Sequence, residues 1–516
     1  MEKRIRRLGI FMMLCLVALF VQLNNIQVVK ANSLATNPAN PRVQLIARSQ
    51  PRGDIISADG VTLASSVLAP PKSVDKYQRV YNPNTAVLFA QIVGYDSPKY
   101  GNFNGVESEY NNFLVAHNRP VKSIRDLLTN QTVVDNVTLT INSNLQREVA
   151  QAVDTGAPGV NGAAAVVLDP TTGAVLAMYS NPTFDPNPLV SANLDTETAY
   201  WNAENNKQLN PGNPLRAGTY NQINPPGSSF KVVTASAVLQ DRPDLAAMTY
   251  PVVPSIPLPD TGTPPQVLTN YQGELCGGTL EEIVIQSCDA DFASIGQQLG
   301  ATALVSQAQA YGFNQRIPLD VPSDTVAPSN FGTVADFSQS GQSGIPGLMK
   351  SAIGQQNVSA SALQMAMVAG TVANGGVEMT PHVMAQIRDS QGNLVEAYTP
   401  KPWQRSISSQ TAATLTTFMQ GVVTSGTAAG VGFPASWNVA AKTGTAQVGS
   451  FGPNPLLTTD WLIAFANNGA SKVAVAVVLP NQPGSATGAQ YSGPIVKEIL
   501  QDILGNQTPA NGGGGQ

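Results

Sequence analysis

Pro225-Pro226-Gly227-Ser228-Ser229-Phe230-Lys231 is followed by a run of apolar and small residues from Val232 to Leu239. Pro and Gly end the preceding segment and the run has helical composition, so the sequence predicts Ser228 at a helix N-terminus with Lys231 one turn later. A lysine whose charge is destabilised by burial can accept the serine proton, while the helix N-terminus stabilises developing negative charge. The stretch therefore predicts a nucleophilic serine, Ser228, activated by Lys231.

Histidine is scarce in this chain. His117 and His382 are its only histidines, and neither lies in a cluster of Cys, Asp or Glu at metal-ligand spacing. We therefore expect no metal and no cofactor, and a lysine is the usual substitute for histidine as the base of a serine nucleophile. The spacing S-x-x-K is weak by itself, because it recurs at Ser73 to Lys76 and because serine is an ordinary helix cap.

The composition excludes one class of partner. The chain has 516 residues, long enough for two or three domains, and a net charge of -5 with 12% charged residues. Contact with phosphate requires a concentrated positive face, so the sequence disfavours nucleic acid as a partner.

The N-terminus carries a topological signal. Four basic residues precede an apolar run from Leu8 to Leu23: Lys3, Arg4, Arg6 and Arg7. At about 1.5 Å per residue the run spans most of a bilayer core. We expect residues 1–7 to be a cytoplasmic tail, 8–28 a transmembrane anchor and the rest of the chain extracytoplasmic. A cleaved signal peptide, favoured by the small residues near Ala31, is the alternative.

Two further motifs have the residue types of an acyl-transfer site. Lys442-Thr443-Gly444-Thr445 lies in a strand-like run of small residues, where a second backbone can lie alongside. Lys442 would attract a substrate carboxylate, Thr443 would supply a hydroxyl, and the strand edge would bind an extended peptide. Ser287-Cys288-Asp289 follows an amphipathic stretch, and Ser287 would relay a proton to a leaving amine.

The motifs occur in the order S-x-x-K, then Ser287-Cys288-Asp289, which we call the serine element, then K-T-G. This order matches that of β-lactamases and penicillin-binding proteins. Over nearly its whole length the chain resembles class B penicillin-binding proteins, in particular the actinobacterial A-type peptidoglycan transpeptidases. Four further segments support the resemblance: Arg52-Gly53-Asp54-Ile55 with Asp59-Gly60, Gly105-Val106-Glu107 with Tyr110, Asp169 to Gly173 with Ala177-Met178, and Gly354-Gln355 with Leu363 to Ala366.

The resemblance implies an α+β fold. Its catalytic domain would be of the serine D,D-peptidase and β-lactamase type, an antiparallel sheet flanked by helices, and it would carry a β-rich N-terminal pedestal and one transmembrane helix. We expect a pedestal, dimerisation-like domain over residues 33–146, a penicillin-binding transpeptidase domain over 147–505 and a disordered tail over 506–516.

Local patterns predict several of its elements. They are a strand at Val43 to Ala47, hairpins around Asp59-Gly60 and between Ala163 and Tyr179, a helix after a cap at Asn142 or Ser143, a strand pair between Trp461 and Leu479, and a helix from Tyr491 to Leu504.

The resemblance also implies an activity. Ser228 would attack the penultimate D-Ala carbonyl of a peptidoglycan stem peptide, release the terminal D-Ala and pass the acyl group to an amine of a neighbouring strand. The backbone N–H groups of Ser228 and Thr445 would hold the oxyanion. Asp289 and the K-T-G-T residues Lys442, Thr443, Gly444 and Thr445 would bind substrate. β-Lactams would acylate Ser228, and other cell-wall synthesis or division proteins would be partners in the membrane.

One residue departs from the family pattern. The second motif of the family usually ends in Asn, where this chain has Asp289. A carboxylate only accepts hydrogen bonds unless it is protonated, so we expect Asp289 to pair with Lys231 or Lys442 and to favour the charged amine.

A disulfide is also expected. Cys276 and Cys288 lie in the exported part, where oxidising conditions favour pairing across a short loop; the alternative is two free thiols.

Other functions stay open. A D,D-carboxypeptidase or a β-lactamase-like hydrolase uses the same serine, although no E-x-x-L-N element follows Ser287. A non-catalytic β-lactam sensor or a division scaffold on this fold is the alternative outside enzymes.

Overall fold

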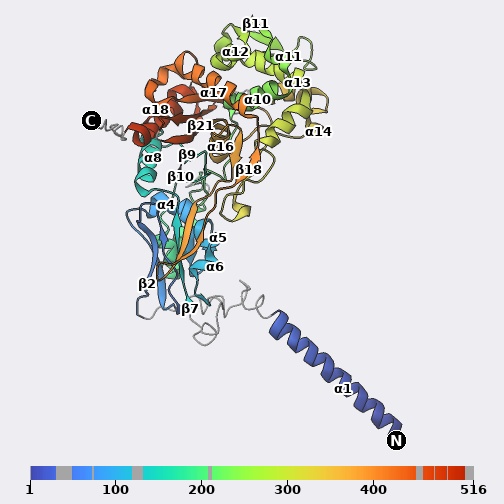
Figure 1. Cartoon of the computed structure of the whole chain (residues 1–516), viewed down its shortest axis with the longest axis vertical. Coiled ribbons are helices and arrows are strands. Elements are labelled where there is room, and N and C mark those ends of the chain that lie inside the picture. Colours follow the sequence, from blue (N-terminus) through green and yellow to red (C-terminus); the bar gives the residue numbers. More distant parts are fainter. Residues whose placement is uncertain are drawn as a thin grey trace, which may run out of the picture.

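The computed structural model describes residues 2–30, 49–71, 75–118, 132–206, 208, 212–448, 457–469, 471–484 and 486–505. A β-rich body and a larger α+β body stack end to end, and a long N-terminal helix stands apart from both (Figure 1). The strand predicted at Val43 to Ala47 and the tail predicted at 506–516 lie outside the described residues.

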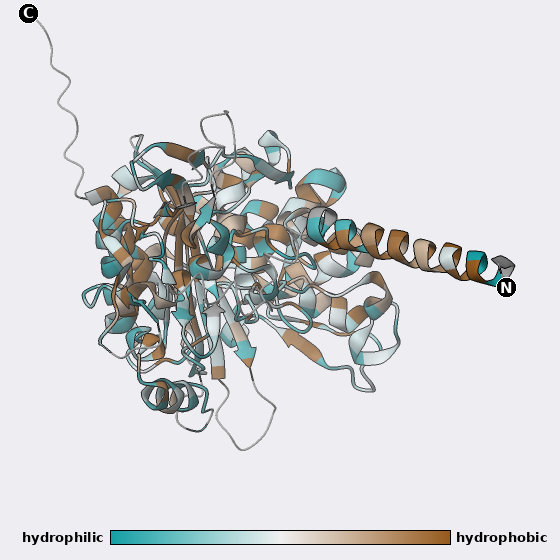
Figure 2. Ribbon diagram, turned by 90° about the horizontal axis from the view of Figure 1, so that it is seen from below, coloured by the Kyte–Doolittle hydropathy of each residue, from teal (hydrophilic) through white to brown (hydrophobic). Residues whose placement is uncertain are grey.

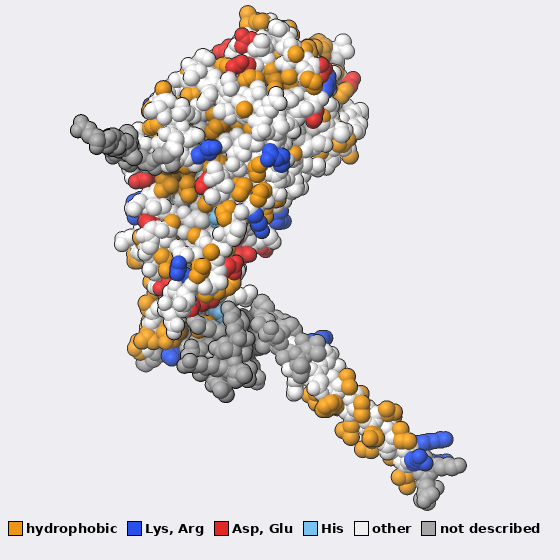
Figure 3. Space-filling view, viewed as in Figure 1, with side chains coloured by type: hydrophobic (Ala, Val, Ile, Leu, Met, Phe, Trp, Pro, Cys, Tyr) orange, Lys and Arg blue, Asp and Glu red, His pale blue; other side chains and the backbone are white. Residues whose placement is uncertain are grey.

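The N-terminal helix is apolar and exposed. Helix α1 (Glu2–Asn24) continues as a π-helical turn to Val29, and its apolar surface is plain in Figure 2. Basic side chains gather at its free end (Figure 3). Residues 4–27 are long and apolar enough to cross a membrane, and by length and composition a signal sequence near the N-terminus passes the same test. The helix fits a single-pass anchor.

The pedestal is built on a six-stranded sheet. Its strands lie in the order β17-β16-β8-β1-β2-β3. The hairpin predicted around Asp59-Gly60 is present, because β1 pairs antiparallel with β2. Their bounds are β1 Ile55–Ile56, β2 Thr62–Leu68, β3 Tyr77–Tyr81, β8 Asp135–Leu139, β16 Met384–Asp389 and β17 Leu394–Ala397.

The last two strands of this sheet come from a distant part of the chain. β16 and β17 come from the segment assigned to the transpeptidase domain, yet β16 pairs antiparallel with β8 of the pedestal. The predicted boundary at residue 147 also falls inside helix α8 (Ser143–Gly156), which starts at the predicted cap, Asn142. Pairing between strands about 250 residues apart leaves no local sequence signal, so the addition of β16 and β17 to the pedestal sheet could not be predicted.

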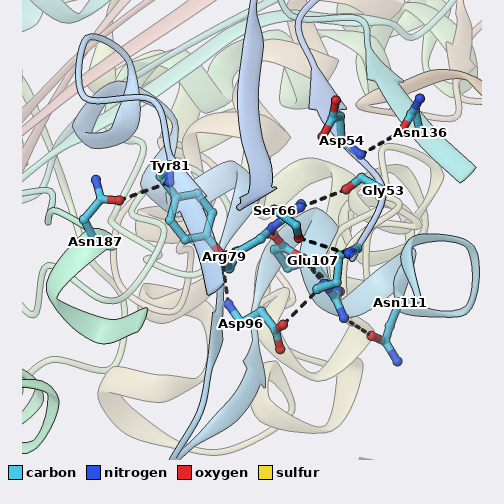
Figure 4. Close-up of polar contacts among 11 residues, drawn as sticks. Gly53, Asp54, Ser66, Arg79, Tyr81, Asp96, Glu107, Asn111, Asn136 and Asn187 are labelled. Atoms are coloured by element: carbon cyan, nitrogen blue, oxygen red, sulfur yellow. Dashed lines mark hydrogen bonds and ion pairs between the residues drawn. The ribbon is translucent and has the colours of Figure 1, made fainter. Parts of the chain in front are cut away.

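Two arginines and a glutamate form the polar centre of the pedestal (Figure 4). Glu107 is fully buried and lies 2.8 Å from Arg52 Nη2 and 2.5 Å from Arg79 Nε. Burial alone would raise the pKa of Glu107, but Arg79 and Arg52 hold it below its usual range. The Tyr81 hydroxyl donates a further hydrogen bond to the same carboxylate. The sequence segments around Arg52 and Glu107 are therefore two halves of one buried ion cluster.

The larger body contains a five-stranded antiparallel sheet in the order β10-β9-β21-β20-β19. The hairpin predicted between Ala163 and Tyr179 forms β9 and β10, and the pair predicted between Trp461 and Leu479 forms β20 and β21. β19 is an edge strand, as the K-T-G segment predicted. The bounds are β9 Ala163–Leu168, β10 Val175–Asn181, β19 Ala440–Val448, β20 Leu457–Asn467 and β21 Lys472–Pro483.

Helices α8, α16 and α18 pack against strands β10, β21 and β20 of the central sheet, respectively, whereas α4, α5 and α6 lie in the β-rich body (Figure 1). The predicted C-terminal helix starts three residues earlier than expected, as α18, and closes with a π-helical turn at Gln501–Gly505. The helices are α4 Ala86–Val93, α5 Gly105–Glu109, α6 Asn111–Leu114, α9 Leu194–Glu204, α10 Lys231–Asp241, α11 Pro243–Ala246, α12 Leu280–Gln286, α13 Asp289–Ala310, α14 Val334–Phe337, α15 Ile345–Ser351, α16 Ala362–Ala373, α17 Ser409–Thr424 and α18 Gly488–Leu500.

Short strand pairs complete the described structure. They are β4 Tyr95–Ser97 with β5 Gly101–Phe103, β6 His117–Asn118 with β7 Thr132–Val133, β11 Thr249–Val253 with β14 Cys276–Thr279, β12 Ser255–Pro257 with β13 Val267–Thr269, and β15 Val377–Met379 with β18 Pro402–Arg405.

Candidate active site

The candidate nucleophile lies on a tight helical turn. Ser228 is in a 3₁₀ turn, Gly227–Phe230, which runs directly into α10 at Lys231. Gly227 has a φ of +53°, a conformation that favours glycine. A Cβ atom there would lie 2.7 Å from the carbonyl oxygen of Thr445. Glycine at this position therefore lets the nucleophile turn lie directly against the edge strand β19.

The K-T-G strand meets this turn from the other side. A Cβ atom on Gly444 would overlap the carbonyl oxygen of Pro226 and lie 3.1 Å from the Ser229 nitrogen. The Trp461 indole of β20 donates a hydrogen bond of 2.8 Å to the Pro225 carbonyl. Close backbone packing and this hydrogen bond hold the nucleophile turn on the edge of the sheet.

The serine element brings the two motif lysines together. Ser287 ends α12 in the left-handed region, with a φ of 64°, which is uncommon for a residue other than glycine. Lys231 Nζ donates to the Ser287 carbonyl at 2.6 Å and lies 3.2 Å from Ser287 Oγ. Lys442 Nζ donates to the same Oγ at 2.8 Å. Ser287 therefore bridges two lysines from different elements, both 0% exposed.

Asp289 starts α13 beside Ser228. Its Oδ1 accepts a hydrogen bond from Lys231 Nζ at 2.7 Å and lies 3.4 Å from Ser228 Oγ. Of the two lysines expected as its partner, the structure pairs Asp289 with Lys231. Ser228, Lys231, Ser287, Asp289 and Lys442 thus form one chain of contacts.

Burial shifts the pKa values of both lysines downward. For Lys231, desolvation lowers the pKa more than the charge and hydrogen bond of Asp289 raise it. Desolvation lowers the pKa of Lys442 well below its usual range, and the positive charge of Lys231 lowers it further. Burial therefore lowers the proton affinity of both lysine amines.

The other K-T-G-T residues face neighbouring elements. Thr443 Oγ1 lies 2.6 Å from Thr427 Oγ1, and the Gly488 N–H at the start of α18 donates to Thr445 Oγ1 at 3.1 Å. The contact with Thr427 was missed in the sequence, because Thr427 belongs to no motif and meets Thr443 only through the fold.

A second carboxyl near Lys231 was also missed. Asp291 is buried on α13, and its Oδ2 has no hydrogen-bond partner among the described residues. Burial raises the pKa of Asp291 to about 6, against the lowering effect of Lys231. Its position two residues after Asp289 was the only available sequence signal.

A disulfide fastens the serine element. The structure joins Cys276 of β14 to Cys288, with their Cα atoms 5.5 Å apart. Cys288 lies between Ser287 and Asp289, so the crosslink holds the segment that contacts both lysines. Among the described residues, no group of three or more His, Cys, Asp or Glu side chains could hold a metal ion.

The chain matches two family models. Residues 163–501 match the penicillin-binding protein transpeptidase domain, and residues 52–136 match the penicillin-binding protein A dimerisation domain. Both matches lie within the predicted catalytic and pedestal segments, respectively.

Curated relatives and solved structures agree with these models. The chain is 33% identical to peptidoglycan D,D-transpeptidase PbpA of Mycobacterium tuberculosis and of Mycolicibacterium smegmatis, over 98% of this chain and 99% of each relative. It is similar to the ceftriaxone acyl-enzyme complex of penicillin-binding protein A from M. tuberculosis, with a TM-score of 0.77, 32% identity and coverage of 89% of this chain and 100% of the other. It is also similar to the penicillin G acyl-enzyme complex of the same protein, with a TM-score of 0.76, 31% identity and coverage of 88% of this chain and 100% of the other. The chain belongs to the class B penicillin-binding proteins.

Proposed function

We propose that this chain is a membrane-anchored peptidoglycan D,D-transpeptidase that forms an acyl-enzyme on Ser228 and is acylated there by β-lactams. The relatives that match nearly its full length are named as transpeptidases of this kind. The observation that carries the proposal is the convergence of the Ser228 hydroxyl, the Lys231 amine and the Lys442 amine around Ser287 and Asp289.

The proposed acylation moves one proton. Lys231 in its neutral form takes the proton from Ser228, whose oxygen attacks the penultimate D-Ala carbonyl. The proton then passes through Ser287 to the leaving amine, and terminal D-Ala departs. An amine of a neighbouring stem peptide resolves the acyl-enzyme by the reverse route. The contacts of Ser287 with both lysines support this relay.

The edge strand is the proposed binding surface. Lys442 Nζ and the Thr443 hydroxyl bind the substrate carboxylate, and the edge strand β19 binds the stem peptide as an added strand. The N–H groups of Ser228 and Thr445 hold the oxyanion, an interaction worth about 3 kcal/mol in other acyl transferases. The packing of Gly227 against Thr445 supports this assignment, because it brings these two backbone segments together.

The cellular arrangement follows from α1. Basic residues before the apolar run favour a cytoplasmic N-terminus, with the pedestal (residues 33–146) and the transpeptidase domain (147–505) outside the membrane. The pedestal and the anchor are the surfaces proposed to meet other cell-wall synthesis or division proteins.

Labelling with a fluorescent penicillin tests the proposal. The full chain in detergent is incubated with the label, and the covalently labelled band is followed over hours. A stable adduct is expected on the wild type; rapid turnover would favour a β-lactamase-like hydrolase, and an unlabelled wild type would favour a division scaffold. A stem-peptide donor with a free amine acceptor separates the remaining activities: a cross-linked product indicates a transpeptidase, and D-Ala release alone indicates a carboxypeptidase.

A further inference from the structure

One end of the pedestal sheet faces away from the transpeptidase body. Thr140, which follows β8, donates a hydrogen bond of 2.6 Å to the Val175 carbonyl of β10, so that end of the sheet meets the catalytic body. β1 runs parallel to β8, and β2 runs antiparallel to β1. β2 therefore ends, at Leu68, at the opposite end of the pedestal (Figure 1).

The hairpin of β2 and β3 protrudes at this end. β1 pairs with β2 only as far as Ala64, whereas β2 and β3 stay paired as far as Leu68 and Tyr77. The four further residues of β2 lengthen the hairpin by about 13 Å, at about 3.3 Å per residue. The Ala69 N–H then donates a hydrogen bond of 3.0 Å to the Lys76 carbonyl, so the pairing continues past β2.

The protruding part of the hairpin exposes apolar side chains. Leu68 is 71% exposed and Val67 is 44% exposed, although strand residues nearer the sheet, such as Leu63 and Ala64, are buried. Hydrophobic side chains at this lower end of the pedestal are visible in Figure 3. We call the exposed apolar residues and the basic and aromatic pair beside them the hairpin tip: Val67, Leu68, Pro70, Pro71, Lys76 and Tyr77.

A lysine and a tyrosine lie at the base of these apolar residues. Lys76 is exposed, and its Nζ lies 5.3 Å from the ring centre of Tyr77, the residue that pairs with Leu68. Aliphatic side chains beside Lys and Tyr are typical of the surface of a bilayer, where the ammonium and the phenol stay among the headgroups. Asp75 follows the same loop and offsets the charge of Lys76, so apolar burial and not net charge would drive such a contact.

The chain enters the pedestal beside the hairpin tip. The Arg52 N–H donates a hydrogen bond of 3.0 Å to Ser66 Oγ, one residue before Val67. Residues 31–48 connect this region to the helix that fits a membrane anchor, and a segment of that length spans at most about 65 Å. A bilayer that holds α1 is therefore tethered near the hairpin tip, which raises its effective concentration there. Chain connectivity thus favours a lipid surface over a separate protein.

We propose that the hairpin tip lies in the membrane interface, with Val67 and Leu68 at the upper acyl chains of phospholipids and Lys76 at their phosphate groups. This inference rests on the proposed anchoring of the chain by α1. The contact stands the pedestal end-on to the bilayer. The transpeptidase body, which lies on the opposite end of the pedestal, is then held away from the lipid (Figure 1).

Tryptophan fluorescence of the full chain in phospholipid nanodiscs tests the proposal. The emission of Leu68→Trp is measured with and without lipids brominated on the upper acyl carbons, and the signal of the four native tryptophans is subtracted with the wild type. Leu275→Trp is the matched control, because Leu275 in the transpeptidase body is 69% exposed, against 71% for Leu68. The emission added by Leu68→Trp is expected to fall at least about twofold with brominated lipid, since interfacial side chains reach the acyl boundary. That of Leu275→Trp should not change.

Tyr77→Trp is a second probe, which exchanges one aromatic residue for another and so adds no new apolar group to the hairpin tip. Its added emission should also be quenched by brominated lipid. If Leu68→Trp does not fold, Tyr77→Trp decides. The salt concentration should alter the quenching little, because the tip carries Lys76 and Asp75 together.

Other results overturn the inference. Equal quenching of the tip variants and Leu275→Trp would show that the hairpin tip has no special contact with lipid, as would quenching of neither. A tip emission that changes only when a second copy of the chain is added, without quenching by lipid, would assign this surface to a protein contact. A chain that does not enter nanodiscs contradicts the anchoring in the proposed function. A chain that enters them and is labelled by penicillin, but shows no quenching at the tip, contradicts only this inference.

Discussion

Lys442 Nζ donates a hydrogen bond of 2.8 Å to Ser287 Oγ, although 155 residues separate the two in sequence. The same Oγ lies 3.2 Å from Lys231 Nζ, so one hydroxyl links the proposed base to the proposed carboxylate-binding lysine. Because both lysines are fully buried, the hydroxyl lies in a site where hydrogen bonds are strong and unpaired groups are costly.

Ser287→Ala removes this bridge. We expect acylation by penicillin to slow by about 100-fold or more, the usual effect of losing a positioned proton-transfer group. Stopped-flow measurement of the acylation rate checks this, with Ser323→Ala on the surface as the control. An unchanged rate in Ser287→Ala would exclude the relay.

Gly444→Ala tests the close approach of the edge strand and the nucleophile turn. The added Cβ atom would overlap the Pro226 carbonyl oxygen, a backbone atom that cannot move alone, so the turn must shift away from β19. A displacement of about 1 Å costs on the order of 100-fold in rate. The acylation rate is compared with that of Gly430→Ala, where a Cβ atom meets nothing within 4 Å. Equal rates in the two variants would contradict the packing described.

Glu107→Gln tests the ion cluster of the pedestal. Without the carboxylate, Arg79 and Arg52 lose the buried acid that they share, although Arg52 keeps an ion pair of 3.3 Å with Asp96. Breaking a buried pair costs about 3 kcal/mol or more of unfolding free energy. Denaturant unfolding measures the loss against Glu109→Gln, an exposed glutamate on the same helix. Similar stabilities of the two variants would show that Glu107 does not hold the pedestal together.

Glu378 makes stability depend on pH. Burial raises the pKa of this carboxyl to about 8, although Gln404 donates a hydrogen bond of 2.6 Å to it. The folded state therefore keeps a proton that the unfolded state loses near pH 4.5, so the free energy of unfolding falls as pH rises from there through about 8. Glu378→Gln should remove this part of the fall, whereas Glu396→Gln, exposed on β17, should not. Thermal unfolding at pH 5, 7 and 9 measures the difference, and parallel curves for wild type and Glu378→Gln would contradict it.

Local patterns predicted the elements that carry the site. The Pro-Gly break before Ser228 marks the start of a helix, and the small residues around Gly444 mark an edge strand. Both signals are local, because a helix start and close backbone packing depend on the residues at those positions. The hairpin of β9 and β10 follows from a turn signal between two apolar runs for the same reason.

Long-range contacts were beyond local patterns. Nothing in the sequence indicates that β16 and β17 pair with the pedestal sheet. The contact of Thr427 with Thr443 has no sequence signal either. The sequence also does not show that Asp289 forms its ion pair with Lys231 and not with Lys442. Each depends on how distant segments pack, and the composition of those segments is compatible with other partners. The burial of Lys442 could not be predicted either, since a lysine in a strand is usually exposed to solvent.

Peptide mapping by mass spectrometry after reaction with penicillin tests the central claim most directly. The account predicts that the peptide containing Ser228 gains the mass of one intact penicillin molecule, and that Ser228→Ala, checked for unaltered thermal unfolding, gains none. An adduct on a different residue, or an equal adduct in Ser228→Ala, would contradict Ser228 as the nucleophile.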